Sequence, residues 1–529
     1  MASDAICGFF CLVSHGRYSA GERLVERHAL TAWLERVARL AFGYRLGLAL
    51  LLGALTVLGF APYYLFWLPW LTLAALLGLW QQARTPAQVF QLGMAFGLGL
   101  YSVGIYWIYI SLHTFGGMPW WFAGFCTFCL CAFMALFPAG AGYLAKRLGT
   151  VMLSAPMLWA LSDWVRSWIF TGFPWLTLGY SQAPDSPLAG FLPLVGVYGV
   201  SALVMLLAAS LFMLTGQAKR RQSIPFIAGL LLGGSAFTQI PWTQAVGQPI
   251  RVALVQGNIS QTVKWSPTHA EQTMRQYLQM VRQAQATLIV LPETALPVLL
   301  EQVDPAYLDA LRQHALDQQG DLLVGVVEAK PGEYFNSAIS LGISPTQSYA
   351  KSHLVPFGEY IPLKSVFGWI YRDWLHMPLS DLSRGLSKQP LLIAGQKIGV
   401  NICYEDVFGD EIAQQLPQAE LLVNLSNDAW YGQSFAADQH MQFSQVRAIE
   451  TGRMVLRSTN TGATAIIDKN GQVLQHAPHD EAVILAGEAQ SYRGQTPYVC
   501  WGNGAFLLLS VAGLLGLYFR QFFKGIILR

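Results

Sequence analysis

Eight long apolar segments constrain this sequence more than any other feature. A helix that crosses a membrane needs about 20 mostly apolar residues. Seven segments of this kind precede residue 245, the seventh being short and Gly-rich, and one follows residue 498. We therefore predict a multi-span α-helical membrane domain of about eight transmembrane helices. The expected spans are residues 43–62, 64–80, 90–112, 120–145, 151–170, 194–215, 224–237 and 502–519.

The sequence between the last two spans has an ordinary globular composition, although the whole chain is 53% hydrophobic and only 12% charged. We divide the chain into an N-terminal cytoplasmic extension (1–42), a transmembrane domain of about seven spans (43–244), a soluble domain (245–498) and a last span with a tail (499–529). Residues 28–42 have helical apolar spacing. An amphipathic helix on the inner membrane surface and a plain cytosolic helix both fit it.

Basic residues occur in every other loop and at both ends of the chain, which predicts that these segments are cytoplasmic. Seven spans before the soluble domain then place that domain on the outer face. If the seventh segment did not span, the domain would face the cytoplasm, and the basic C-terminus argues against this. The basic residues concerned are Arg23, Arg27, Arg36, Arg39, Arg45, Arg84, Lys146, Arg147, Lys219, Arg220, Arg221, Arg520, Lys524 and Arg529.

The soluble domain alternates short β-rich runs with helical patterns, which is typical of an α/β fold. Asn470-Gly471 predicts a hairpin turn. The expected helices are residues 269–284, 304–318 and 439–452. The expected strands are residues 250–255, 287–291, 322–327, 337–341, 398–404, 421–425, 454–458 and 463–467.

Composition and motifs exclude several function classes. A net charge of +3 without a basic run argues against nucleic-acid binding. The seven cysteines have no metal-ligand spacing with histidines, and no phosphate loop or dinucleotide fingerprint occurs. We therefore expect no metal and no cofactor. Cys126, Cys129 and Cys131 lie in an apolar stretch, where buried thiols are expected.

Cys403 is the one cysteine within residues 245–498, and it follows the strand-like run 398–402. Strand ends in α/β folds are where reacting groups are usually displayed. Outside the membrane a lone cysteine has no partner in its domain for a structural disulfide. A buried, inert thiol is the alternative that composition alone leaves open.

Three motifs have the chemistry to work with this thiol. They are Leu291-Pro292-Glu293-Thr294, the segment from Lys351 to Glu359, and Cys403-Tyr404-Glu405. Together and in this order they resemble the nitrilase superfamily, which uses a Glu–Lys–Cys triad. The resemblance implies an α-β-β-α sandwich for residues 245–498.

The arrangement of spans around this domain is similar to that of the bacterial apolipoprotein N-acyltransferases, and the resemblance covers nearly the whole chain after about residue 43. The family commonly has Trp-Pro-Glu where this chain has Leu291-Pro292-Glu293. Further motifs that carry the resemblance are Gly172-Phe173-Pro174-Trp175, Val255-Gln256-Gly257-Asn258, Lys264-Trp265, Leu354-Val355-Pro356-Phe357-Gly358-Glu359, Ser426-Asn427-Asp428-Ala429-Trp430 and Leu456-Arg457-Ser458-Thr459-Asn460.

The resemblance implies the substrates and the compartment. The donor would be a phospholipid such as phosphatidylethanolamine. The acceptor would be the α-amino group of the N-terminal diacylglyceryl-cysteine of a lipoprotein, in the last step of its maturation. The enzyme would lie in the bacterial inner membrane, with its catalytic domain periplasmic and both termini cytoplasmic. A monomer is the simplest oligomeric state.

The triad residues have the groups that such a transfer needs. Cys403 would be the nucleophile and form a thioester. Glu293 would be the general base if burial raises its pKa. Lys351 would favour the thiolate and stabilise the oxyanion, together with a backbone N–H near Tyr404.

Other residues are assigned supporting roles. The resemblance implies that Glu359 holds the triad lysine or moves protons, and that Tyr404 and Glu405 are tied to activity. A loop carboxylate and a local salt bridge are the alternatives for the two glutamates. Trp265 and Trp175 are expected to contact substrate, and an anchor at the membrane interface is the alternative for both.

Four other charged residues are expected to be structural. Asp163 and Arg166 lie inside the fifth expected span, where ionisable groups are functional candidates, but their spacing favours an ion pair. His440 and Arg447 lie on an expected helix without partners that suggest a Cys–His dyad.

Two other functions remain open from the residues. A membrane-tethered amidase of the nitrilase type would use the same triad to transfer the acyl group to water, although one span would suffice as a tether. A transporter or scaffold with an inactive hydrolase-like domain fits less well, because few charges lie in the spans and the triad residues are all present.

Overall fold

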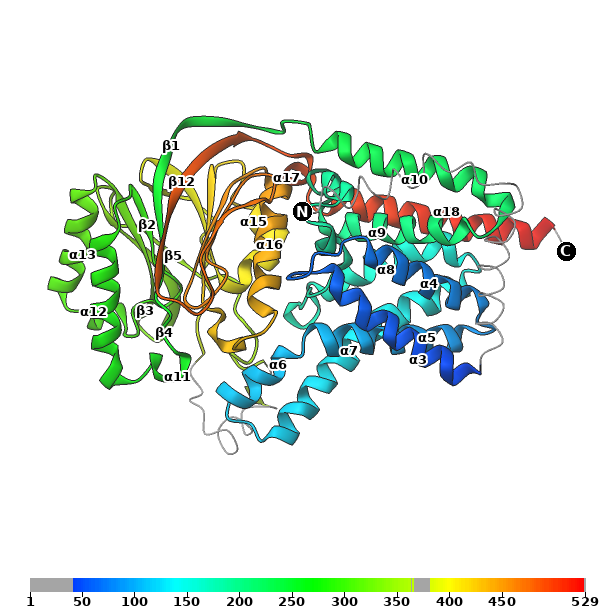
Figure 1. Ribbon diagram of the computed structural model, residues 1–529, viewed down its shortest axis with the longest axis horizontal. Helices are drawn as coiled ribbons and strands as arrows, with labels where there is room; N and C mark the ends of the chain where they lie inside the picture. The colour runs from blue at the N-terminus through cyan, green and yellow to red at the C-terminus, as the bar shows by residue number, and fades with distance from the viewer. Residues whose placement is uncertain (1–40, 363, 366–380, 528–529) are drawn as a thin grey trace, which may run out of the picture.

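The computed structural model describes residues 41–362, 364–365 and 381–527. These residues form a helical part and a part built on two β-sheets, which lie end to end (Figure 1). Most of the N-terminal extension, including nearly all of the expected amphipathic helix, lies outside the described residues.

A helix occupies each of the eight apolar segments. Pro at the start of α4 and α5 and the basic last turn of α7 are ordinary features of helix ends. The helices are α3 (Phe42–Thr56), α4 (Leu68–Gln82), α5 (Pro86–Gly104), α7 (Trp120–Arg147), α8 (Val151–Arg166), α9 (Leu192–Met213), α10 (Gln217–Phe237) and α18 (Gly504–Ile527).

Fewer helices than expected qualify as membrane spans when they are judged by length and composition. Among the described residues, four helical stretches are long and apolar enough to cross a membrane: Phe42–Gly59, Trp120–Arg147, Pro187–Met213 and Gly504–Phe523. A fifth results if α5 and the stretch Trp107–Phe115, bent by 52°, count as one span. Helices α4 and α8 have only 15 and 16 residues, about 22–24 Å of helix, against a membrane core of about 30 Å. The expected count of about eight is therefore not confirmed.

Each sheet has six strands. The first has the order β12-β1-β2-β3-β4-β5 and the second β11-β10-β9-β8-β7-β6. The first sheet comprises β1 (Thr243–Gln256), β2 (Leu288–Val290), β3 (Asp321–Lys330), β4 (Glu333–Gly342), β5 (Ser348–Ala350) and β12 (Val483–Gly494). The second comprises β6 (Leu391–Ile393), β7 (Gln396–Ile402), β8 (Leu421–Ser426), β9 (Val455–Thr459), β10 (Ala465–Ile467) and β11 (Val473–His476).

The two sheets pack face to face, with helices on both outer faces. Alternate residues of β1 face opposite ways: Val252 and Leu254 pack against the second sheet, whereas Ala253 and Val255 pack under the helices. Helices α12 (Pro267–Gln283) and α13 (Pro305–Asp317) cover the first sheet, and α15 (Gly409–Ala413) and α16 (Ala436–Thr451) cover the second. This is the expected α-β-β-α sandwich, and all eight expected strands are present.

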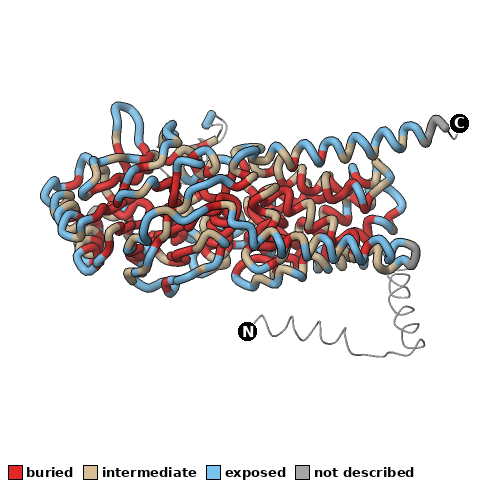
Figure 2. The backbone as a smooth tube through the Cα atoms, turned by 90° about the horizontal axis from the view of Figure 1, so that it is seen from above, coloured by how far each residue is buried: buried red, intermediate tan, exposed pale blue. Residues whose placement is uncertain are grey.

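Helix α16 joins the sandwich to the membrane helices. Met441 and Ala448 pack on the second sheet, while Phe443 and Val446 belong to the apolar cluster of the membrane helices. Buried residues accordingly fill both parts and the zone between them, whereas most residues of α18 are exposed or half-buried (Figure 2).

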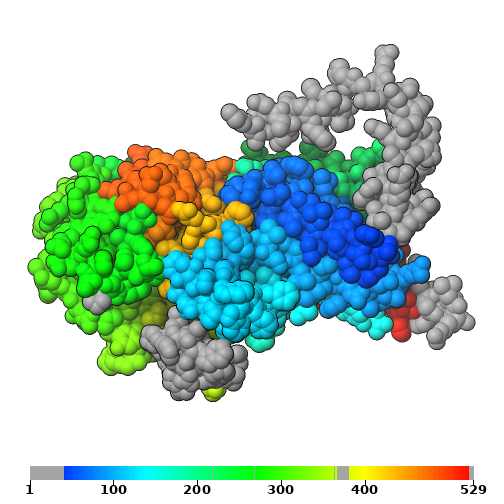
Figure 3. All heavy atoms as spheres, turned by 60° about the horizontal axis from the view of Figure 1, so that its bottom comes forward, coloured from blue at the N-terminus to red at the C-terminus, as the bar shows by residue number. Residues whose placement is uncertain are grey.

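A second contact between the two parts lies at α6 (Trp107–Ile110), which follows α5. Trp107 packs edge-on against Tyr431, with ring centroids 4.6 Å apart, and Phe115 lies 6.0 Å from Trp430. The residues of α6 and the start of α7, drawn in cyan, abut the sandwich in the space-filling view (Figure 3).

Candidate active site

Cys403 follows β7 directly and begins the short 3₁₀-helix η8 (Cys403–Val407). Its φ of 53° lies in the left-handed region, which a residue with a Cβ adopts at a cost and which occurs at functional sites. Its carbonyl oxygen accepts hydrogen bonds from Asn424 Nδ2 (3.2 Å) and His440 Nε2 (3.1 Å). Side chains from β8 and α16 thus hold the turn that presents the thiol.

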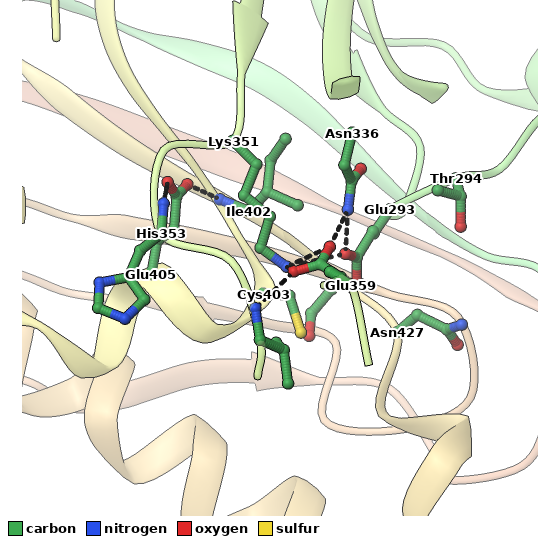
Figure 4. A network of polar contacts seen from close by, with 12 residues as sticks. Glu293, Thr294, Asn336, Lys351, His353, Glu359, Ile402, Cys403, Glu405 and Asn427 are labelled. Carbon is green, nitrogen blue, oxygen red and sulfur yellow. Dashed lines mark hydrogen bonds and ion pairs between the residues drawn. The ribbon is translucent and has the colours of Figure 1, made fainter. Parts of the chain in front are cut away.

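The other two triad residues follow strands of the first sheet. Glu293 comes after β2, and Lys351 comes directly after β5. The Lys351 ammonium lies 3.4 Å from Glu293 Oε1 and 2.9 Å from Glu359 Oε2, and the lysine is only 1% exposed. Figure 4 shows these side chains converging beside Cys403. The structure therefore brings the three predicted triad residues and Glu359 together.

Asn336 on β4 completes the cluster, and we did not predict it from the sequence. Its Nδ2 donates to Glu293 Oε1 (2.7 Å) and to Glu359 Oε1 (2.9 Å), so one amide joins the two carboxylates. A polar residue in a strand is usually solvated, and only the pairing of β4 with β5 brings this one next to Lys351.

Electrostatics favour a neutral thiol beside a charged lysine. Burial raises the pKa of the Cys403 thiol, the Glu293 carboxylate adds to this, and Lys351 opposes it. Burial would lower the pKa of Lys351, but Glu359 and Glu293 outweigh burial and raise it well above its usual value. The proton of Cys403 therefore has to leave as the thiol attacks, and it needs an acceptor nearby.

Glu405 ties the nucleophile turn to the segment after Lys351. Its carboxylate accepts hydrogen bonds from the Tyr349 hydroxyl (2.9 Å), the Ser352 amide (2.6 Å) and the Ile402 amide (2.7 Å). Further donors are the hydroxyl of Ser352 and the amide of His353. Glu405 thus holds the turn at Cys403 and the segment after Lys351 in place relative to each other.

Tyr404 and Trp175 lie where the sandwich meets the membrane helices. The Tyr404 hydroxyl donates to the carbonyl of Gly172 (2.7 Å), and its ring stacks on Trp175, with centroids 5.9 Å apart. Trp175 is 2% exposed, whereas Trp265 is 50% exposed at the end of α11 (Gln261–Lys264). The substrate contacts of the two tryptophans stay predictions.

Arg166 supports this junction from within the membrane helices. It pairs with Asp163 at 3.0 Å, so the expected ion pair is present. It also donates to the carbonyl oxygens of Phe173 (2.9 Å) and Trp175 (2.6 Å), and so holds the loop on which Tyr404 packs.

A buried charge network lies behind Cys403, and its aspartates were not singled out from the sequence. His440 bonds to Asp406 and Asp428 at 2.9 and 2.7 Å, and Arg457 pairs with the same two carboxylates at 3.0 and 2.9 Å. The expected structural role of His440 agrees with this position, because its contact with the site is through the backbone of Cys403. Among the described residues, no group of three or more His, Cys, Asp or Glu side chains could hold a metal ion.

Comparison with known proteins identifies the family. Residues 52–210 match the family model of the apolipoprotein N-acyltransferase N-terminal domain, and residues 251–498 match that of the carbon-nitrogen hydrolases. The apolipoprotein N-acyltransferase of Nitrosomonas europaea is 52% identical over 485 residues, which cover 89% of this chain and 96% of the relative. The chain belongs to the apolipoprotein N-acyltransferase family.

Other relatives agree with this assignment. The apolipoprotein N-acyltransferase of Chromobacterium violaceum is 45% identical over 486 residues (88% of this chain, 93% of the relative). That of Methylococcus capsulatus is 40% identical over 486 residues (90% and 95%). The protein is therefore an acyltransferase of lipoprotein maturation, and the amidase alternative is not favoured.

Proposed function

We propose that this N-acyltransferase moves a fatty acyl chain from a phospholipid, through a thioester on Cys403, to the α-amino group of the N-terminal diacylglyceryl-cysteine of a lipoprotein. The observation that carries the proposal is the buried cluster of Glu293, Lys351 and Glu359 around a thiol on a strained strand end.

In the first step the Cys403 sulfur attacks the ester carbonyl of the phospholipid while Glu293 accepts the thiol proton. The ammonium of Lys351 stabilises the negative oxygen of the tetrahedral intermediate. The intermediate collapses by breaking the ester C–O bond. Glu293 returns the proton to the departing alkoxide, and a lysophospholipid leaves.

In the second step the acceptor amine attacks the thioester carbonyl, and Glu293 takes one proton from the amine nitrogen. The C–S bond then breaks, an amide is formed, and the proton returns to Cys403. Glu359 holds Lys351 in place throughout, since it is the carboxylate nearest the ammonium. Donor and acceptor use the same thiol in turn, so the kinetics are ping-pong.

The proposal extends to topology: eight spans in the inner membrane, with α4 and α8 crossing together with the residues that flank them, a periplasmic sandwich, cytoplasmic termini and a monomer. The antiparallel pair β1 and β12 carries the chain from α10 into the sandwich and back toward α18 (Figure 1). The basic start of α10 and Arg520 near the end of α18 therefore lie at the helix ends away from the sandwich. Lys146 donates to the carbonyl of Gln81 (3.2 Å), so the basic end of α7 meets the end of α4. Basic residues gathered at helix ends support a cytoplasmic face there.

The test is acyl transfer in mixed micelles from phosphatidylethanolamine with a labelled fatty acid. The acceptor is a diacylglyceryl-cysteine peptide, and the control is the same peptide with an acetylated α-amine. We expect label on the free-amine peptide alone. Label released only as free fatty acid, equally with both peptides, would overturn the proposal in favour of a hydrolase.

A further inference from the structure

A second buried lysine lies beside the charged cluster. Lys264 is the last residue of α11 and is 2% exposed, although its neighbour Trp265 is half exposed. Its Nζ donates to the main-chain oxygen of Glu293 (3.1 Å) and to the hydroxyl of Thr294 (2.6 Å). Both groups belong to the turn that carries the proposed general base.

Packing alone does not explain why the Lys264 ammonium is buried. Both of its acceptors are uncharged, and a buried charge without a close partner is costly. The titratable groups that interact with it are the Glu293 carboxylate and the Cys403 thiol. Burial lowers the pKa of Lys264 to about 8, and the two facing groups oppose that effect, so the amine is largely protonated at neutral pH.

The Lys264 ammonium balances the net charge of the site. Lys351 contributes one positive charge between the carboxylates of Glu293 and Glu359, which leaves one negative charge in excess. A protonated Lys264 makes the buried cluster neutral. Moving the proton of Cys403 to Glu293 keeps it neutral, so the second ammonium can offset negative charge that develops on sulfur.

The backbone beside Glu293 also needs support. Thr294 has a φ of 45°, in the left-handed region that a β-branched residue adopts only under constraint. The Lys264 ammonium donates hydrogen bonds to the main-chain oxygen of Glu293, which precedes this residue, and to the side-chain hydroxyl of Thr294 itself. These bonds hold the backbone from which the Glu293 side chain extends.

We propose that Lys264 is a positioning residue of the acyl transfer: its ammonium locks the Glu293–Thr294 turn and supplies the second positive charge of the site. The inference rests on the proposed function of Cys403 and Glu293. If this ammonium served stability alone, its replacement by a hydrophobic side chain would lower the unfolding midpoint and leave the rate of thioester formation by the folded enzyme unchanged.

The experiment compares Lys264→Met with a matched control, Lys330→Met, which changes an exposed lysine at the end of β3. Four quantities are measured on the full chain in detergent: the thermal unfolding midpoint, the single-turnover rate of thioester formation with phosphatidylethanolamine, the KM for phospholipid, and the rate of Cys403 alkylation by iodoacetamide. We expect Lys264→Met to unfold within a few degrees of the control and to form the thioester about 10- to 100-fold more slowly, as for lost charge-assisted hydrogen bonds. Alkylation should slow with it, and the KM for phospholipid should stay unchanged. Lys264→Arg, which keeps the charge, should recover part of the rate.

Thioester formation by Lys264→Met within about threefold of the control would overturn the inference, as would an Arg variant no faster than the Met variant. If Lys264→Met does not fold, the Thr294→Val variant tests the inference in its place. It keeps the charge and removes one acceptor, so a several-fold slower reaction at an unchanged unfolding midpoint supports the inference and a wild-type rate refutes it. Failure of the proposed function would look different, because the wild type itself would then form no thioester.

Discussion

His440, which bonds to the backbone of Cys403, gives the enzyme a predictable dependence of stability on pH. Burial and the nearby Arg457 lower the pKa of His440, but Asp406 and Asp428 outweigh them and raise it from 6.5 to about 9. The imidazolium therefore donates to both aspartates at neutral pH. Asp428 does not titrate in the same range, because its interactions with His440 and Arg457 overcome burial and lower its pKa to about 2.

The sign and size of the effect follow from these pKa values. A group whose pKa is raised on folding contributes its stability below the unfolded value, here 6.5, and loses it as the pH rises through about 9. Each pH unit corresponds to about 1.4 kcal/mol, so the contribution is about 3 kcal/mol. With roughly 2–4 °C per kcal/mol for a domain of this size, the unfolding midpoint should fall by about 6–12 °C from this source.

The assay is differential scanning fluorimetry of the full chain in detergent at one heating rate, since large proteins often unfold irreversibly. The comparison variant is His440→Gln, which can keep hydrogen bonds but carries no charge. We expect the wild type to exceed the variant most near about pH 6 and to lose that advantage by about pH 10. A gap between the two proteins that is the same at both pH values would refute a charged His440.

Three further substitutions test the site. Glu405→Gln places an amide among N–H and O–H donors, so the rate of thioester formation should fall about 10- to 100-fold and the unfolding midpoint should drop. A wild-type rate in a single-turnover assay would contradict the role of Glu405 in holding the two loops together. Asn336→Leu removes the amide that joins Glu293 to Glu359, so steady-state kinetics should show a kcat about tenfold lower with an unchanged KM. A change in KM alone would contradict this expectation. Tyr404→Phe removes one hydrogen bond at the domain junction, about 1 kcal/mol, so calorimetry should show a midpoint roughly 2–4 °C lower, and an unchanged midpoint would argue that the bond contributes nothing.

The alternation of apolar runs with helical patterns was sufficient to predict an α/β domain, and the family resemblance implied the sandwich. Strand β8, for example, has all six residues buried and is apolar except for Asn424 and Ser426. The strands that were not predicted lack this signal: β5 and β6 have three residues each, and most residues of β12 are at least partly exposed. The number of spans was less predictable, because apolar composition does not reveal that α4 and α8 are short.

The site shows the same division between local and non-local information. Cys403 follows an apolar strand directly and Glu293 follows one after two residues, so their placement at strand ends could be predicted from local pattern. Lys351 follows the short β5, which lacks this pattern, and the family resemblance implied its role. Asn336 lies within a strand, and Lys264 ends a short helix far from the triad in sequence. Their contacts depend on sheet pairing and helix packing, which single residues do not indicate.

The central claim is a thioester on Cys403, and intact mass spectrometry of the protein incubated with phosphatidylethanolamine tests it most directly. The account predicts that the wild type gains the mass of one fatty acid less one water, and that the diacylglyceryl-cysteine peptide removes this adduct. Cys403→Ala should gain nothing. An acyl adduct of the same mass on Cys403→Ala, or a wild type that transfers label to the peptide with no adduct at any time, would contradict it.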